Sequence, residues 1–207
     1  MNPTKTLPET YSLAWSLNMK KDRRLNWTLQ VVGLIWFFVA AFLLLKAVAV
    51  LRPDFVFAGT SDAGTVLLWG LVAVLIILVT VTIHELVHGF FFLIFSKSMP
   101  QFGLGPGYAY AAAPDWYFPK WKYIVIGIAP LVVLTVVGLI SISLAPMAWI
   151  PTLFLAVAFN AGGAISDIYV CIRIGFEAPN IWVKDTGDGF EIYGKLIGDS
   201  GDSHLSG

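Results

Sequence analysis

Residues 64–95 read GTVLLWGLVAVLIILVTVTIHELVHGFFFLIF. A helix needs about 20 predominantly apolar residues to cross the roughly 30 Å hydrocarbon core of a bilayer, and this run exceeds that length. Its only ionisable side chains are His84, Glu85 and His88, which lie close together in its second half. The run therefore predicts a transmembrane helix that carries a polar cluster.

Three further segments are apolar enough to span a membrane: residues 27–51, 123–145 and 150–174. In the whole chain 57% of the residues are hydrophobic and only 13% are charged, whereas soluble domains carry about 25% charged residues. This composition excludes a soluble enzyme, a disordered chain and a nucleic-acid binder with a basic surface. The sequence predicts an all-α membrane protein with four transmembrane helices.

Positive charges set the predicted orientation. Cytoplasmic loops collect Lys and Arg, and a basic cluster precedes the first span at Lys20, Lys21, Arg23 and Arg24. We therefore expect a multi-pass protein of the cell membrane with both termini in the cytoplasm. The predicted parts are an interfacial arm or a frayed terminus over 1–26, a membrane domain over 27–174, and a cytoplasmic tail over 175–207.

Two segments outside the spans favour strands. Residues 96–122 are rich in Gly, Pro and aromatic residues and predict a loop or short strands at headgroup level. Residues 181–184 and 190–193 flank the sequence DTGDG, which predicts a C-terminal hairpin. The triplet Asp185-Thr186-Gly187 also copies an aspartic-protease motif, but that site needs two facing copies and the chain has one.

The cluster in residues 64–95 has the pattern His84-Glu85-Leu86-Val87-His88. Positions i and i+4 share one face of a helix, so the two imidazoles can bind one metal ion while Glu85 reaches a water on that metal. This is the zinc-peptidase signature. The alternative is a pair of buried histidines bonded to nearby backbone.

A catalytic zinc usually has three protein ligands and one open position, so a third ligand is expected. Asp167 lies in the fourth span at nearly the same predicted depth as His84 and His88, because the second and fourth spans run in the same direction. The alternatives for Asp167 are a helix cap or an ion pair with Arg173. The third histidine, His204, is a poor candidate because it lies near the C-terminus.

Asn160 precedes Asp167 by two helical turns and shares its face. Its amide could donate a hydrogen bond to a developing oxyanion, which makes it a candidate catalytic residue. The alternative is a polar contact between helices.

At these residues the chain resembles two related groups of proteins. His84-Glu85-Leu86-Val87-His88-Gly89 in one membrane helix, with an aspartate in a later one, resembles the site-2-protease class of intramembrane metalloproteases. More closely, this motif, Ser166-Asp167-Ile168-Tyr169, the four spans and the short strand-like C-terminus resemble the family of putative zincin peptidases. The resemblance covers roughly residues 65–195 and implies a membrane metallopeptidase.

The sequence thus predicts a zinc-dependent intramembrane endopeptidase with one Zn²⁺ per chain. His84, His88 and Asp167 are the predicted ligands, and Glu85 is the predicted general base. The expected partners are the lipid bilayer and a membrane-embedded or membrane-proximal peptide cut near the cytoplasmic face, and no nucleic acid. The alternative is a non-proteolytic membrane protein with a sensory, transport or degenerate metal site, in which iron or cobalt could replace zinc.

Overall fold

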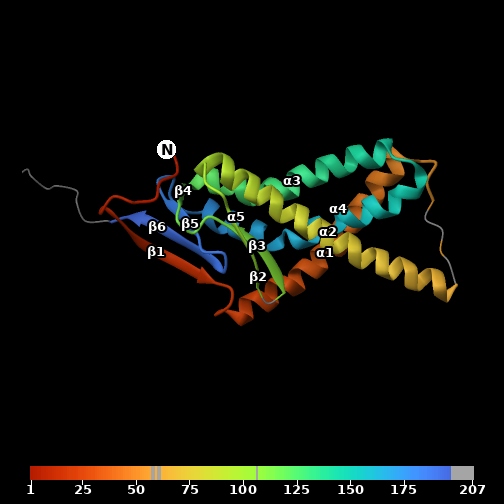
Figure 1. The fold of residues 1–207 in the computed structure, drawn as a ribbon, viewed down its shortest axis with the longest axis horizontal. Helices are drawn as coiled ribbons and strands as arrows, with labels where there is room; N and C mark the ends of the chain where they lie inside the picture. The colour runs from red at the N-terminus through yellow and green to blue at the C-terminus, as the bar shows by residue number, and fades with distance from the viewer. Residues whose placement is uncertain (57–58, 60–61, 106, 197–207) are drawn as a thin grey trace, which may run out of the picture.

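Apolar helices run side by side through most of the protein, and a small antiparallel sheet lies across one end of them (Figure 1). The computed structural model describes residues 1–56, 59, 62–105 and 107–196. The helices are α1 (Arg23–Leu51), α2 (Ala63–Ser96), α3 (Lys120–Leu144), the 3-10 turn η1 (Met147–Trp149), α4 (Ile150–Gly163) and α5 (Ile165–Gly175). The strands are β1 (Tyr11–Asn18), β2 (Gln101–Gly105), β3 (Tyr108–Ala112), β4 (Tyr117–Pro119), β5 (Trp182–Asp185) and β6 (Gly189–Lys195).

Within the described residues, α1, α2 and α3 are each long and apolar enough to cross a membrane. The segment formed by η1 and α4 passes the same test only together with α5, to which it is joined at a bend of 40°. The continuous helix predicted over 150–174 is therefore broken, and the described residues contain three candidate spans, or four if the bent pair is one. Gly162 and Gly163 precede the break, and glycine weakens a helix interior.

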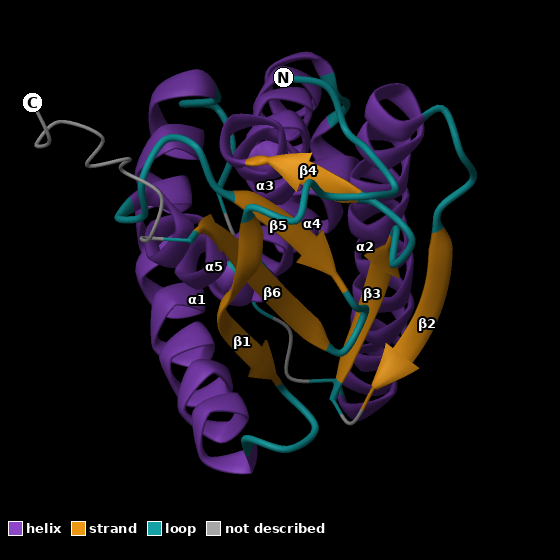
Figure 2. Ribbon diagram, turned by 90° about the vertical axis from the view of Figure 1, so that its left-hand side faces the viewer, coloured by secondary structure: helices purple, strands orange, loops and turns teal. Residues whose placement is uncertain are grey.

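The strands form two antiparallel sheets at the same end of the helices, which faces the viewer in Figure 2. The larger has the order β1-β6-β5-β4, and β2 pairs with β3 in the smaller. The predicted C-terminal hairpin is confirmed as β5 and β6, and the predicted strands of residues 96–122 as β2 to β4. The fold is thus mostly helical rather than all-α. The predicted arm over 1–26 contains β1, which pairs with β6.

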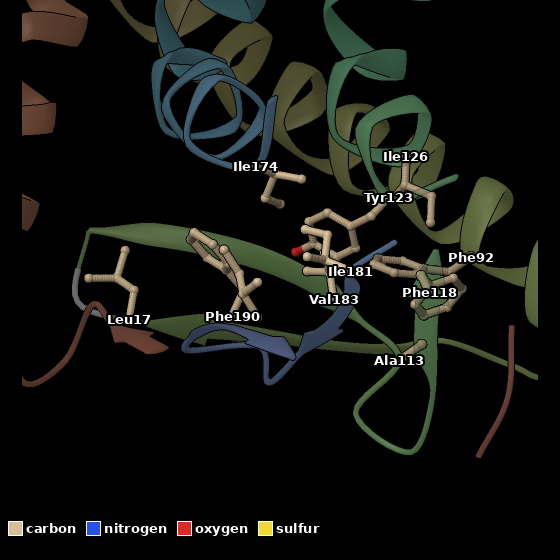
Figure 3. Packing of buried hydrophobic residues seen from close by; sticks show 11 residues of the cluster. Leu17, Phe92, Ala113, Phe118, Tyr123, Ile126, Ile174, Ile181, Val183 and Phe190 are labelled. Atoms are coloured by element: carbon tan, nitrogen blue, oxygen red, sulfur yellow. The ribbon is translucent and has the colours of Figure 1, made fainter. Parts of the chain in front are cut away.

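Buried side chains attach the larger sheet to the helix ends (Figure 3). Val183 of β5 and Phe190 of β6 belong to one apolar cluster with Phe92 of α2 and Tyr123 of α3. Phe92, Val183 and Phe190 are each no more than 2% exposed. The cluster therefore fixes the sheet close to the turn of α2 that carries His88.

Candidate metal centre

Two helices bring three potential metal ligands together. His84 and His88 lie one turn apart on the buried face of α2, and their ring centroids are 5.0 Å apart. Asp167 lies in the first turn of α5, just after the break in the fourth apolar segment. Its Oδ2 atom is 3.1 Å from His84 Nε2 and 3.5 Å from His88 Nε2. One potential ligand atom from each residue falls within 4.8 Å of the others, as the matching depths predicted.

Asn160 orients the His84 ring through Nδ1, the ring nitrogen that does not contact Asp167. Its side-chain oxygen lies 2.9 Å from His84 Nδ1, and its amide nitrogen lies 3.4 Å from the carbonyl oxygen of Pro130. A carbonyl can only accept a hydrogen bond, which assigns the Asn160 Nδ2 group to Pro130 and leaves Oδ1 to accept from His84. His84 therefore donates from Nδ1, and in the neutral ring the lone pair of Nε2 points toward Asp167.

Pro130 orients the His88 ring through the backbone of α3. Proline has no N–H, so the carbonyl of Ile126, four residues earlier, loses its helical donor. That carbonyl accepts a hydrogen bond from His88 Nδ1 at 2.9 Å. The lone pair of His88 Nε2 therefore also points toward Asp167.

These hydrogen bonds explain what the centre can bind. Two imidazole nitrogens and one carboxylate oxygen converge on the same small volume, and each ring, when neutral with its proton on Nδ1, directs a lone pair there. Buried acceptors that face one another repel unless a positive charge lies between them. Nitrogen and carboxylate oxygen together suit a zinc-type divalent ion. The residues present therefore fit a metal ion, and His ligands held through their other nitrogen are the usual arrangement.

Glu85 lies next to the three converging side chains but outside their ligand set. It is half-buried, lines the same cavity as the histidines, and has the backbone of Ala111 in β3 beside its carboxylate. A carboxylate in this position can accept a proton from a water or a substrate within the cavity.

A cavity of about 790 Å³ adjoins the centre. Helices α1, α2 and α5 line it together with β3 and the turn between β5 and β6. Its ionisable lining side chains include His84, Glu85, His88, Asp167 and Asp185, and none of the described residues that line it is a lysine or an arginine. The volume is in the range of small-molecule and peptide sites.

The turn between β5 and β6 brings two further carboxylates to this region. Asp185 accepts hydrogen bonds from the Tyr123 hydroxyl at 2.6 Å and from the Gly187 amide at 2.8 Å. Burial raises the pKa of Asp185 to about 6, although both hydrogen bonds lower it. Asp188 pairs with Lys20 at 2.8 Å and accepts from the Tyr108 hydroxyl. Burial and this carboxylate raise the pKa of Tyr108 to about 12, so its hydroxyl remains a donor.

The structure shows the contacts of two residues for which alternatives were open. Arg173 pairs with Glu177, just beyond the end of α5, and not with Asp167. Asn160 lines the cavity, and its side chain contacts His84 and Pro130. His204 lies outside the described residues.

Sequence reasoning missed what two residues, Pro130 and Asp185, contribute to the site. Pro130 inside an apolar span was a signal for a free carbonyl, since a helical proline always removes one hydrogen bond. Asp185 was dismissed because the triplet Asp185-Thr186-Gly187 occurs once, whereas an aspartic protease needs two copies. No local sequence pattern indicates that the hairpin turn folds over the cavity.

The profile of one protein family, described as "Putative zincin peptidase", matches residues 77–181 of the chain. The matched segment includes His84, Glu85, His88, Asn160 and Asp167 and ends before Asp185. No curated protein and no solved structure matches the chain. Because the profile covers half of the sequence and all three converging ligands, the chain belongs to the putative zincin peptidase family.

Proposed function

We propose that the protein is a zinc-dependent intramembrane endopeptidase in which His84, His88 and Asp167 hold one Zn²⁺ and Glu85 is the catalytic base. The observation that carries this proposal is the convergence of three lone pairs beside a carboxylate that is not a ligand. A metal site used only for sensing or transport needs no such carboxylate directly after the first histidine.

A zinc ion, when bound, polarises a substrate carbonyl and lowers the pKa of a coordinated water to about 7. Glu85 takes the proton of the attacking water and returns it to the leaving amine, acting as base and then as acid. Asn160 and the Ile126 carbonyl keep the histidines in the tautomer that leaves Nε2 free. The proton thus moves between water, Glu85 and the amine, while the histidines keep theirs.

Strand β3 is suited to present the substrate. A helical peptide hides its backbone, so a substrate must be held extended for cleavage. Residues 108–111 of β3 line the cavity, and within the described chain β3 pairs with β2 alone. The other edge of β3 can therefore accept the backbone of an extended peptide beside Glu85.

The apolar helices support cleavage within or next to a membrane. Large apolar side chains on α1, α2 and α3 are exposed along most of their length, which suits contact with lipid. The described residues before α1, between α2 and α3, and after α5 all lie at the sheet end of the helices (Figure 1). We infer that this end faces the cytoplasm, that the membrane domain covers residues 27–174, and that the enzyme acts as site-2 proteases do.

The experiment is a cleavage assay in proteoliposomes. Purified protein is co-reconstituted with a mixture of bacterial membrane proteins, and new peptide termini are identified by mass spectrometry. We expect termini that disappear after zinc chelation, return on zinc addition and are absent with Glu85→Gln. If purified protein retains zinc but produces no such termini, the non-proteolytic alternative is correct.

Substitution of Asn160 separates an orienting role from an oxyanion role. Asn160→Leu removes the acceptor for His84, and loss of such a partner typically weakens metal affinity by about 10–100-fold. Asn160→Asp keeps an oxygen acceptor and is expected to bind zinc almost as wild type does. Zinc titration with a competing chelator measures both. If Asn160→Asp instead keeps zinc and loses cleavage, the amide donates to the oxyanion.

Pro130→Ala tests the freed carbonyl. The new N–H can donate to Ile126, so that carbonyl is shared between the helix and His88. We expect zinc affinity to fall by about tenfold, at the lower end of the range for such partners, while the helix itself becomes more regular. Val132→Ala, at an exposed position two residues away, is the matched control. Unchanged affinity in Pro130→Ala would show that His88 needs no external orientation.

A further inference from the structure

Asp185 presents a fixed carboxylate to the cavity of the metal centre. The residue ends β5, and its two oxygens accept hydrogen bonds from different elements, Tyr123 of α3 and Gly187 of the following turn. Gly187 has a φ of +78°, and a Cβ there would come within 2.5 Å of the Tyr110 ring. The turn that holds Asp185 is therefore packed against β3 and cannot easily move away.

The charge of Asp185 has no counter-ion in the described structure. No Lys or Arg lies among the described residues that line the cavity, and none of the ion pairs of the described residues includes Asp185. The cavity is lined by three carboxylates, those of Glu85, Asp167 and Asp185. A divalent ion bound by His84, His88 and Asp167 would offset two of these three negative charges. One negative charge remains, and a buried charge is costly unless it is paired.

The neighbouring Asp188 shows the contrast. It lies three residues further along the same turn but is already paired with Lys20 and bonded to Tyr108. Asp188 therefore has a cationic partner within the chain, whereas Asp185 lines the cavity and has hydrogen bonds but no such partner.

We propose that Asp185 is a specificity-determining residue that binds the basic side chain of a lysine or arginine near the scissile bond of the substrate. The proposal rests on the proposed peptidase function. An extended peptide advances about 3.3–3.6 Å per residue, and Asp185 lines the same cavity as His84, His88 and Asp167. The basic residue therefore lies within a few positions of the cleaved bond. The ring of Tyr110, packed against Gly187, gives the same cation an aromatic neighbour.

The first arm of the test measures binding in the zinc-loaded Glu85→Gln protein in nanodiscs, where nothing is cleaved. The probes are fluorescent heptapeptides with blocked termini, in which one arginine is scanned through every position. Each peptide is compared with its twin, a peptide of the same sequence in which neutral citrulline replaces the arginine. We expect at least one arginine peptide to bind about tenfold more tightly than its twin, as for a charge-assisted hydrogen bond.

Two substitutions are made in this background. Asp185→Asn keeps a partner for Tyr123 and Gly187 but removes the charge, and it is expected to abolish the preference for arginine. Asp188→Asn, the matched control in the same turn, is expected to retain the preference. Equal binding of the twins at every position, or a preference that survives Asp185→Asn, would overturn the proposal.

The second arm measures cleavage of a diverse peptide pool by the zinc-loaded enzyme. We expect cleaved bonds to be enriched for nearby Lys or Arg in wild type and not in Asp185→Asn. Cleavage without this enrichment would overturn the basic subsite and leave the peptidase intact. Arginine-dependent binding without any cleavage would instead overturn the peptidase and leave the cationic site.

Discussion

Asp167→Ala is expected to leave the protein without bound zinc. The substitution removes the one anionic ligand from a set of three, and the two histidines of α2 remain. Catalytic zinc sites use three protein ligands, and even loss of a residue that only supports a ligand weakens affinity by about 10–100-fold. We therefore expect about one zinc per chain in the wild type and a loss of affinity beyond that range in the variant.

Elemental mass spectrometry of detergent-purified protein measures this loss. Asp185→Asn is the control, because that carboxylate lies in the same cavity but outside the ligand set. Asp167→Asn adds a variant of nearly unchanged shape, in case the cavity left by alanine disturbs the start of α5. If Asp167→Ala retains stoichiometric zinc while His84→Ala loses it, another group completes the site.

The convergence of His84, His88 and Asp167 could be predicted because it depends on regular features of the sequence. Helical periodicity places His84 and His88 on one face, and the lengths of the apolar runs give the depth of each residue in the membrane. Depth and direction together were enough to select Asp167 from the other carboxylates. The structure then showed that Asp167 Oδ2 approaches both histidines.

The surroundings of the site could not be predicted, because they depend on pairings between distant segments. Strand β1 finds its partner in β6, on the far side of all the membrane helices in the sequence. The alternation of YSLAWSLN is weak evidence for a strand when no partner is known. The same holds for Asp185, whose role depends on β5 folding back over α2 and α3.

The break in the fourth apolar segment has a related explanation. A run of 25 apolar residues indicates a span but gives no sign of its shape. Gly162 packs so closely on α1 that a Cβ would lie 2.9 Å from the Cβ of Phe37. Close packing of α4 on α1 and the separate start of α5 let Asn160 and Asp167 reach the same histidine from different directions.

Glu85→Gln is expected to abolish cleavage while leaving zinc in place. Glutamine has nearly the same shape but cannot accept and return a proton, and general acid–base catalysis contributes typically about 10²–10⁴-fold to a rate. Because Glu85 is not one of the three converging ligands, zinc content is expected to stay near one per chain. Glu85→Gln is thus expected to retain zinc and lose activity, whereas Asp167→Ala is expected to lose both zinc and activity.

The turnover number on the best substrate from the proteoliposome assay measures the effect. Glu85→Asp is a useful companion, because it keeps the carboxylate but withdraws it by one methylene from the cavity and from Ala111 of β3. We expect Glu85→Asp to recover part of the lost rate if proton transfer is the missing step. Equal turnover by Glu85→Gln and wild type would assign the proton transfer elsewhere, and the half-buried carboxylate beside the histidines would then serve only the packing of β3 on α2.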